Sequence, residues 1–536
     1  MVDFAKMFVD RLYDHGVRYA FGIPGGPWIP YMEAMRRWET PFILVANEAS
    51  AGFMADVCFR LTGAPALCHG TFGPGATNLA TGVGCAYLDR SALIAATTEQ
   101  SDAMRHRVTQ MNVDHQALFA PITKWTTRAD ADTLTSTIDQ ALATACEEVP
   151  GPVHIGLPVD MNDRNAPGGA GPPDPRPTLA PPSAEAIQAA ADLIRQARRP
   201  LIAVGLTAAR LGLDRSLARL LEVIPAPVVL TPMAKGLLPE THPSYAGVLF
   251  HACSDRLVDI TRQADLVIGL GYDPVEFDYE AWLPPVPVVH IDTAAAELSA
   301  PYELAALCVG DLSVAMQTLG AMAPLATEWD FDQLARHREG LTKALHPRSE
   351  GFGPTEALDI LRDVLPREGI LTCDVGAHTH LIGQLWPTPA PGHFLMTNGW
   401  SSMGFGIPAA LAASLCRPET PVVCVTGDGG FTMMAGELIT ARRLGLNTVI
   451  MILADRMLSL IEVKQGWKNC PADSSRLFQN AFLDADRIFG VPVLKANSPT
   501  ALRQALRQAF DTAGPVVVEA EVDGRDYHQL IARTYK

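Results

Sequence analysis

The sequence has little positive charge and no long hydrophobic run. It carries 42 Lys and Arg residues against 58 Asp and Glu over 536 residues, a net charge of −16, without any basic block. Such a balance argues against nucleic acid or an anionic membrane as the main partner. The apolar run 405–415 contains Pro408 and is too short to cross a bilayer, so no membrane span is expected.

Closely spaced cysteine pairs are also lacking. The ten cysteines stand singly, and no CxxC pattern occurs. This usage is typical of a reducing compartment and of buried thiols. The N-terminal residues enter an amphipathic helical pattern directly and lack a signal-peptide pattern, so we expect a cytoplasmic protein.

A segment rich in proline and glycine, 166–183, divides the chain and predicts an extended linker. On both sides of it, short apolar strands alternate with helical patterns. The expected strands are 19–23, 42–45, 66–68, 91–97, 152–156, 200–204, 228–230, 265–270 and 288–291. A charged helical stretch, about 326–354, leads to a third block that opens with a strand at 370–373. The pattern predicts an α/β fold of three consecutive doubly wound parallel-sheet domains, residues 1–165, 184–325 and 350–536.

Two aspartates follow neighbouring strands of the third block. Asp428 lies in Gly427-Asp428-Gly429-Gly430 after the apolar run 421–426, and Asp455 follows the apolar run 447–453. Because 435–446 predicts a helix, the unit is strand–loop–helix–strand, which places both carboxylates at one edge of a parallel sheet. Hard oxygen ligands beside a glycine-rich turn suit Mg²⁺ carrying a diphosphate, and the alternative is an ordinary turn.

Glu48 opens a predicted helix, 48–61, after the strand 42–45. By itself it is explained as an acidic residue that complements the helix dipole next to a capping Asn47. Glycine-rich segments lie upstream at 21–26 and downstream at 73–79, however, and these give Glu48 a second interpretation.

In their order and spacing, these motifs resemble the thiamine-diphosphate enzymes of the acetolactate synthase and pyruvate decarboxylase superfamily. The resemblance spans essentially the whole chain, and the matching motifs are Asn47-Glu48, 73–79, 374–378, 403–408 and 427–429 with Asp455. It implies a pyrimidine-binding first domain, a central domain and a diphosphate-binding third domain. It also implies a cofactor held between two subunits, so that the protein is at least a homodimer and commonly a homotetramer.

The resemblance implies a role for each matched residue. Glu48 would hydrogen-bond the pyrimidine ring so that the cofactor acts as its own base. Met403 would bend the cofactor, and the Ser401 backbone would contact its aminopyrimidine. The other residues implied to bind the cofactor are Gly376, Ala377, His378, Gly427, Asp428, Gly429, Gly430, Asp455 and Met457, with Mg²⁺ held by Asp428, Asp455 and the Met457 carbonyl.

Asp455 indicates which type of enzyme within the superfamily the chain resembles. Most relatives carry Asn at this position, whereas Asp occurs in the catabolic, flavin-free type of acetolactate synthase. The segments 121–124 and 271–277 also look like that type. FAD is compatible with the superfamily but is not favoured, since Gly205-Leu206-Thr207 is a poor match to a dinucleotide fingerprint.

Two positions depart from the catabolic pattern. Met111 stands where those synthases carry Gln, with Gln110 as a shifted replacement near the substrate. His69 aligns instead with an active-site histidine of benzoylformate decarboxylase, where it would shuttle protons. The structural alternative is a buried histidine whose hydrogen bonds are satisfied.

Leu458, Leu460 and Ile461 predict an apolar lid where pyruvate decarboxylases carry a glutamate. Apolar surroundings favour loss of CO₂ from a 2-oxo acid adduct, and the lid lacks the acid that a simple decarboxylase uses. We therefore expect an enzyme that decarboxylates a 2-oxo acid, with pyruvate as the expected donor, and ligates the remaining unit to a second carbonyl. A simple 2-oxo acid decarboxylase, a flavin-dependent oxidase and a non-catalytic subunit are the alternatives.

Overall fold

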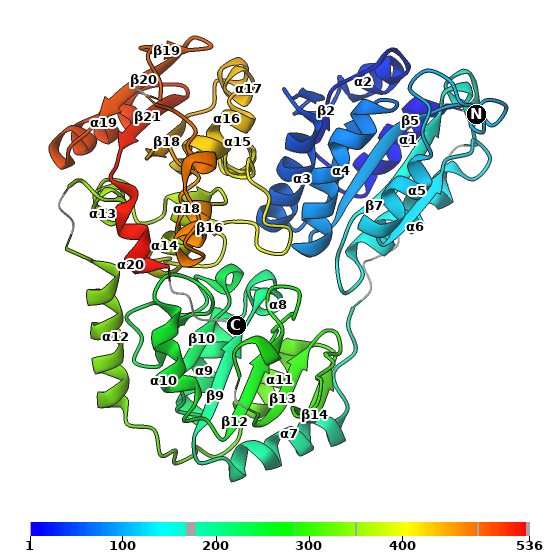
Figure 1. The fold of residues 1–536 in the computed structure, drawn as a ribbon. Coiled ribbons are helices and arrows are strands. Elements are labelled where there is room, and N and C mark those ends of the chain that lie inside the picture. Colours follow the sequence, from blue (N-terminus) through cyan, green and yellow to red (C-terminus); the bar gives the residue numbers. More distant parts are fainter. Residues whose placement is uncertain (1, 168–177, 284, 349–350, 480–481, 532–536) are drawn as a thin grey trace.

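The chain folds into three units, each built on its own parallel sheet, as the sequence predicted. The computed structural model describes residues 2–167, 178–283, 285–348, 351–479 and 482–531. Figure 1 shows the N-terminal and C-terminal units side by side, with the central unit below them. The middle of the predicted linker, 168–177, lies outside the described residues.

The N-terminal unit has a six-stranded parallel sheet in the order β3-β2-β4-β5-β7-β6. Its strands are β2 (Ala20–Gly22), β3 (Ile43–Leu44), β4 (Ala66–Gly70), β5 (Leu93–Glu99), β6 (Trp125–Arg128) and β7 (Val153–Pro158). Its helices are α1 (Phe4–Asp14), α2 (Ile29–Met35), α3 (Glu48–Thr62), α4 (Pro74–Leu88), α5 (His115–Phe119) and α6 (Leu134–Cys146). A separate antiparallel pair joins β1 (Val2–Asp3) to β8 (Asn165–Ala166).

The central unit also has a six-stranded parallel sheet, in the order β11-β10-β9-β12-β13-β14. Its strands are β9 (Pro200–Val204), β10 (Val228–Leu230), β11 (Tyr245–Val248), β12 (Leu266–Leu270), β13 (Pro287–Asp292) and β14 (Glu303–Val309). Its helices are α7 (Ala184–Gln196), α8 (Leu206–Arg210), α9 (Asp214–Val223), α10 (Val258–Thr261) and α11 (Leu312–Leu319). Helix α12 (Phe331–Leu345) is the charged connection that the sequence predicted.

The C-terminal unit has a seven-stranded sheet in the order β16-β15-β17-β18-β21-β20-β19, with the edge strand β19 antiparallel to β20. Its strands are β15 (Ile370–Cys373), β16 (Phe394–Leu395), β17 (Val422–Gly427), β18 (Thr448–Ala454), β19 (Arg487–Ile488), β20 (Val491–Ala496) and β21 (Val516–Glu521). Its helices are α13 (Pro354–Val364), α14 (Ala377–Leu385), α15 (Gly406–Cys416), α16 (Asp428–Met434), α17 (Glu437–Leu444), α18 (Ser459–Trp467), α19 (Pro499–Asp511) and α20 (Tyr527–Leu530).

One local prediction in this unit was wrong. The sequence predicted a loop over 427–434, before a helix at 435–446, but α16 begins at Asp428, directly after strand β17. Gly427 is extended, with φ −81° and ψ 166°, and turns the chain into the helix. An acidic residue in the first turn complements the helix dipole, and Asp428 occupies that place.

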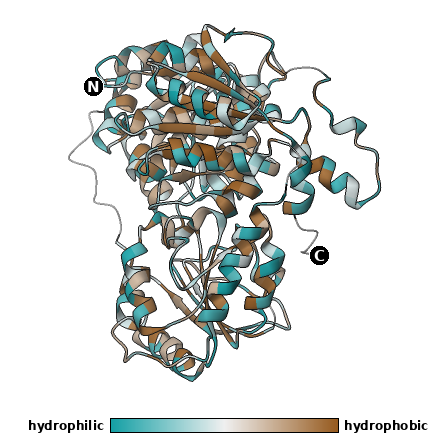
Figure 2. Cartoon of the chain, turned by 90° about the vertical axis from the view of Figure 1, so that its left-hand side faces the viewer, coloured by the Kyte–Doolittle hydropathy of each residue, from teal (hydrophilic) through white to brown (hydrophobic). Residues whose placement is uncertain are grey.

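The N-terminal and C-terminal units share one hydrophobic core. Helix α15 is rich in alanine, which lets it approach α3 closely, and Phe53 of α3 meets Phe405 edge to face at 5.7 Å. Figure 2 shows the strands as mostly hydrophobic and the outer helical faces as mostly hydrophilic. Within the described ranges, every helix is too short or too polar to cross a membrane.

Candidate active site

A cavity of about 250 Å³ lies at the carboxyl edge of the C-terminal sheet. Strand order reverses there, because the chain passes from β15 to β16 on one side and then to β17 on the other. Ligands of open α/β folds bind at such a switch point. The cavity brings together every cofactor residue predicted in this unit: Gly376, Ala377, His378, Ser401, Met403, Gly427, Asp428, Gly429, Gly430, Asp455 and Met457.

Asp374, to which the sequence analysis gave no role, does not line this cavity but holds the backbone of the neighbouring Val375, which does. Its carboxylate is fully buried and accepts hydrogen bonds from the backbone N–H groups of Val375 at 2.7 Å and Gly404 at 2.8 Å. The Thr426 hydroxyl donates a third bond at 2.9 Å. A Cβ at Gly430 would lie 2.0 Å from Asp374 Oδ2, so only glycine fits there.

The two carboxylates of the proposed metal site lie at the ends of adjacent strands, β17 and β18. Asp428 Oδ2 accepts a hydrogen bond from the Arg456 backbone at 2.6 Å, which ties the two strand ends together. Burial, followed by the charge of Asp455, raises the pKa of Asp428 to about 7. Burial also raises the pKa of Asp455 to about 6. A nearby cation would therefore stabilise the ionised form of both carboxyl groups.

The donor chemistry of this pair suits a divalent cation. Carboxylate and carbonyl oxygens are the ligands that Mg²⁺ prefers, and both aspartates line the cavity with Met457. The position of Asp455 is fixed by the Met457 N–H, which donates to Oδ1 at 3.1 Å, and by the Ser459 hydroxyl, which donates to Oδ2.

The cavity is also shaped for an anionic group beside the metal. His378 Nε2 is buried and has no hydrogen-bond partner among the described residues, so it is free to contact a ligand. A Cβ at Gly429 would lie 3.0 Å from the Leu458 side chain and 3.1 Å from Met403, so glycine keeps this side open. These features fit a diphosphate with its metal.

Apolar side chains form the opposite side of the cavity. Leu458, Leu460 and Ile461 line it, as the predicted lid requires, and Met403 faces Gly429. Ser401 has a left-handed backbone, φ 52°, and its hydroxyl donates to the Asn398 carbonyl at 2.7 Å. The side chain is thus engaged locally, which leaves the backbone of Ser401 for a ligand.

Glu48 does not line this cavity. It begins α3 in the N-terminal unit, where the Asn47 side chain caps the helix by accepting from the Ala49 N–H at 2.9 Å. Its side chain is buried, and Asn78 donates to Oε2 at 3.1 Å. Glu48 and the two aspartates of one chain are therefore not parts of the same cavity.

His69 and Gln110 have different surroundings from those predicted for catalytic residues. The His69 ring is fully buried in β4, stacks on Trp28 at 3.7 Å, and bonds the Ala96 carbonyl through Nδ1 at 3.0 Å. Burial lowers the pKa of His69 to about 3, away from the neutral value that a proton shuttle needs. The ring packing and the Nδ1 bond favour a structural role, but Nε2 is buried without a hydrogen-bond partner among the described residues, so only one of the two ring nitrogens is satisfied. Gln110 is exposed in a turn outside the cavity described above.

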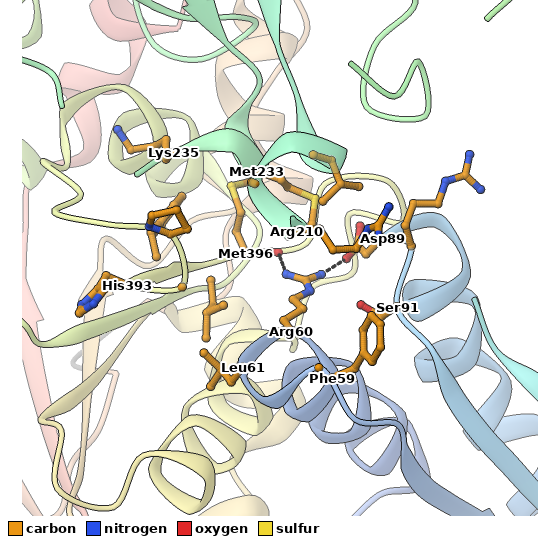
Figure 3. A pocket seen from close by; sticks show the side chains of 18 of the residues that line it. Phe59, Arg60, Leu61, Asp89, Ser91, Arg210, Met233, Lys235, His393 and Met396 are labelled. Carbon is orange, nitrogen blue, oxygen red and sulfur yellow. Dashed lines mark hydrogen bonds and ion pairs between the residues drawn. The ribbon is translucent and has the colours of Figure 1, made fainter. Parts of the chain in front are cut away.

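A second cavity, of about 520 Å³, lies where the three units meet (Figure 3). Five cations line it: Arg60, Arg90, Arg210, Lys235 and Arg417. Arg90 pairs with Asp273 at 2.6 Å, whereas Arg417 donates to the Leu61 carbonyl at 2.7 Å. Arg60 pairs with Asp89 at 2.8 Å. Arg210 pairs with Glu148 at 2.6 Å, and Lys235 with Glu240 at 2.8 Å. The pairs Arg210–Glu148 and Arg90–Asp273 join the N-terminal unit to the central unit, and four of the five cations are paired with a carboxylate.

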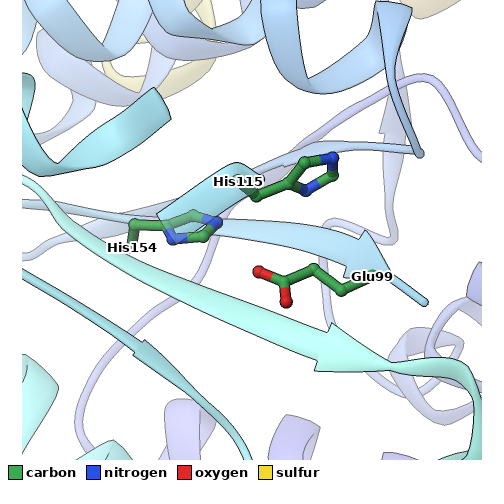
Figure 4. Close-up of side chains that lie close together, drawn as sticks. All are labelled: Glu99, His115 and His154. Carbon is green, nitrogen blue, oxygen red and sulfur yellow. The ribbon is translucent and has the colours of Figure 1, made fainter. Parts of the chain in front are cut away.

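Glu99, His115 and His154 form a buried cluster with metal-ligand types (Figure 4). Its polar atoms are already engaged, however. The Thr97 hydroxyl lies between the two imidazoles, 2.9 Å from His115 Nδ1 and 2.7 Å from His154 Nε2. Arg128 forms an ion pair with Glu99. The cluster is therefore a satisfied hydrogen-bond network of the N-terminal core.

The switch point of the central sheet, between β9 and β12, is closed by the protein itself. Thr207 N–H donates to the Gly271 carbonyl at 3.0 Å, so the two strand ends meet directly. The buried carboxylate of Glu276 accepts from the backbone N–H groups of Leu206 and Met233, each at 3.1 Å. These are the groups that a nucleotide phosphate would otherwise use at this edge.

Comparison with known protein families matches all three units in order. Residues 2–118 match the N-terminal TPP binding domain of thiamine pyrophosphate enzymes, and residues 187–319 match their central domain. Residues 374–520 match the C-terminal TPP binding domain. With the cavity described above, these matches define the class: the chain is a thiamine pyrophosphate enzyme.

Full-length relatives define the family within that class. The chain is 30% identical to a probable acetolactate synthase large subunit of Methanocaldococcus jannaschii, over 97% of this chain and 92% of the relative. It is 29% identical to an acetolactate synthase of Bacillus subtilis, over 97% and 93%. It is 28% identical to a catabolic acetolactate synthase of Raoultella terrigena, over 99% and 97%. The protein belongs to the acetolactate synthase-like family of thiamine pyrophosphate enzymes.

Proposed function

We propose that this enzyme decarboxylates a 2-oxo acid, with pyruvate as the expected donor. It then ligates the remaining unit to a second carbonyl compound and forms a 2-hydroxy ketone such as acetolactate. The observation that carries the proposal is the cavity at the carboxyl edge of the C-terminal sheet. Its carboxylate pair, its apolar lid and His378, whose Nε2 has no hydrogen-bond partner among the described residues, lie together in a chain of acetolactate synthase-like sequence.

The residues of the cavity would hold Mg²⁺ and thiamine diphosphate. Asp428, Asp455 and the Met457 carbonyl would bind the metal, and His378 with the glycines of 427–430 would receive the diphosphate. When bound, the cofactor supplies a carbon nucleophile and an electron sink for the decarboxylation. Met403 would support its rings from one side of the cavity.

Glu48 would act from a second copy of the chain. Its absence from the cavity of its own subunit supports a site completed by a partner, with the Glu48 carboxyl holding a proton against the pyrimidine ring. The enzyme is then at least a homodimer, and a homotetramer is consistent with the family. We further propose that it acts in the cytoplasm.

The composition of the cavity favours ligation over simple decarboxylation. Among the described residues that line it, Asp428 and Asp455 are the only carboxyl groups, and both belong to the metal site. Apart from a Glu48 supplied by a second copy, whose carboxyl would be engaged with the pyrimidine ring, no carboxylic acid would remain there to protonate the product of CO₂ loss. Leu458, Leu460 and Ile461 would also exclude water, so that the product of CO₂ loss reacts with a second carbonyl compound.

The reaction would need no flavin. The closed switch point supports this proposal, because Glu276 already accepts from backbone N–H groups at the sheet edge where open α/β folds bind nucleotides. A cavity of about 380 Å³ beside this switch point is lined by four acidic residues: Asp273, Asp278, Asp292 and Glu297. Their negative charge disfavours binding of an anionic group such as the FAD diphosphate.

Product analysis tests the proposal. The purified enzyme, supplied with Mg²⁺, thiamine diphosphate and pyruvate, should release CO₂ and accumulate acetolactate. Free acetaldehyde without a 2-hydroxy ketone would support the simple decarboxylase instead. A panel of other 2-oxo acids, assayed in the same way, would show whether pyruvate is the preferred donor.

A further inference from the structure

A single side chain of the C-terminal unit holds the backbone that leads into Glu48. Glu437, at the first position of α17, is fully buried. Its Oε1 accepts from the Ala46 N–H at 2.9 Å and from the Asn47 N–H at 3.2 Å. Strand β3 ends at Leu44, and Ala46 and Asn47 are the last two residues before Glu48.

The other oxygen of Glu437 is also engaged, so the carboxylate cannot turn away easily. The Thr440 hydroxyl, one turn along α17, donates to Oε2 at 2.8 Å. Two further contacts bring α17 against the same segment. A Cβ at Gly436 would lie 3.1 Å from the Ala46 side chain, and Arg443 donates to the Leu44 carbonyl.

Removing this carboxylate would leave two backbone donors of the segment without partners. The side chain of Asn47 is occupied as the cap of α3, where it accepts from Ala49, so it cannot replace Glu437. Buried unpaired donors are costly, and the segment would shift to satisfy them. Because Glu48 is the next residue, its carboxyl would shift with the segment.

We infer that Glu437 is a positioning residue for Glu48 and thereby sets the rate of the reaction from outside the cofactor cavity. The inference rests on the proposed role of Glu48. In the proposed dimer it has a further consequence. The helix pair α16–α17 carries Asp428 for its own cofactor and, through Glu437, positions the Glu48 that serves the partner's cofactor.

Glu437→Leu and Glu437→Asp test the inference, since leucine removes the carboxylate and aspartate shortens its reach. Glu437→Gln keeps an oxygen acceptor of the same length. Glu519→Leu is the matched control, because Glu519 is also buried and accepts a backbone N–H, that of Leu483 at 3.2 Å, far along the chain from Glu48. Each variant is measured by hydrogen–deuterium exchange, calorimetry with Mg²⁺ and thiamine diphosphate, and steady-state kinetics.

We expect Glu437→Leu to speed amide exchange in the peptide 44–54 and to lower kcat by about 10- to 100-fold, since displacements near 1 Å have such effects. KM for pyruvate and the Kd for thiamine diphosphate should change by no more than about threefold. Glu437→Asp should show the same pattern, which covers the case that the leucine variant does not fold. Glu437→Gln should stay close to wild type, and Glu519→Leu should leave exchange in 44–54 unchanged.

Unchanged exchange in 44–54 for both the leucine and the aspartate variants would overturn the inference. So would a loss of cofactor binding without any change in that peptide, because the effect would then be confined to the C-terminal unit. The exchange measurement needs no substrate. If wild type proved inactive with every 2-oxo acid, the proposed function would fail while the exchange result still decided whether Glu437 holds the segment.

Discussion

Gly430→Ala should damage the cofactor site although it adds a single methyl group. The new Cβ would lie 2.0 Å from Asp374 Oδ2, 2.8 Å from its Cγ and 2.9 Å from the Thr426 hydroxyl. Ordinary contact needs more than 1 Å of additional space. Asp374 cannot move that far without losing the Thr426 hydrogen bond, and its other oxygen is held by Val375 and Gly404.

The expected cost follows from these contacts. Overpacking of a tight core costs about 1–3 kcal/mol, and a hydrogen bond to a charged group is worth about 1.5–3 kcal/mol. We therefore expect Gly430→Ala to destabilise the C-terminal unit by about 3 kcal/mol. If the protein relaxes by moving α16 instead, Asp428 is displaced and the affinity for Mg²⁺ falls by about tenfold or more.

Thermal melting and calorimetry with Mg²⁺ and thiamine diphosphate measure both effects. The matched control is Gly340→Ala, which lies inside helix α12 where a Cβ would meet nothing within 4 Å. That change should stabilise the protein by roughly 0.5–1 kcal/mol, because alanine favours helix. A Gly430→Ala enzyme that melts and binds its cofactor like wild type would refute the reasoning about Asp374.

Four further variants have definite expected outcomes. Glu48→Gln should remove most activity while the melting temperature and thiamine diphosphate binding stay near wild type; normal turnover would show that Glu48 has no such role. Asp428→Ala should lower Mg²⁺ affinity by about 100-fold, whereas Asp455→Asn should retain binding, because an amide oxygen can still serve as a ligand; equal losses in calorimetry would contradict the assignment. His69→Asn should keep activity and make stability less sensitive to acid. His69 stays neutral in the fold until its pKa of about 3, whereas an unfolded histidine takes up a proton near pH 6.5. Between these values stability falls as pH falls, and at pH 5 this residue costs about 2 kcal/mol relative to pH 7. An inactive His69→Asn enzyme with wild-type stability would support the catalytic role instead.

The strands that were predicted from sequence are continuous apolar runs, whereas β11, β14, β16, β19, β20 and β21 were not predicted. Strands β9, β10 and β15 have the bounds that the apolar pattern predicted. Strand β6 was missed because its residues, Trp125–Arg128, are only half-buried and show no apolar run. The start of α16 was also missed, because a Gly-Asp-Gly-Gly segment favours a turn in isolation, and only the packing against Asp374 makes it helical.

Of the residues proposed to bind the cofactor in the C-terminal unit, the two aspartates were predictable from topology, and the others followed from the family resemblance. Asp428 and Asp455 end adjacent strands, so topology alone places them together. Glu437 had no such signal. In sequence it is an ordinary acidic residue at the start of a helix. Its contact with Ala46, which lies 391 positions earlier in the chain, depends on how the N-terminal and C-terminal units pack together. Likewise, the closure of the central switch point by Glu276 depends on long-range contacts.

Complementation between two inactive variants tests the central claim most directly. Glu48→Gln and Asp428→Ala would each be inactive alone, and the two chains would be co-expressed in equal amounts. If the cofactor lies between subunits, half of the dimers are mixed and each mixed dimer has one intact site, so about a quarter of wild-type activity should return. Activity no higher than that of either variant alone would contradict a site built from the Glu48 of one subunit and the carboxylate pair of another.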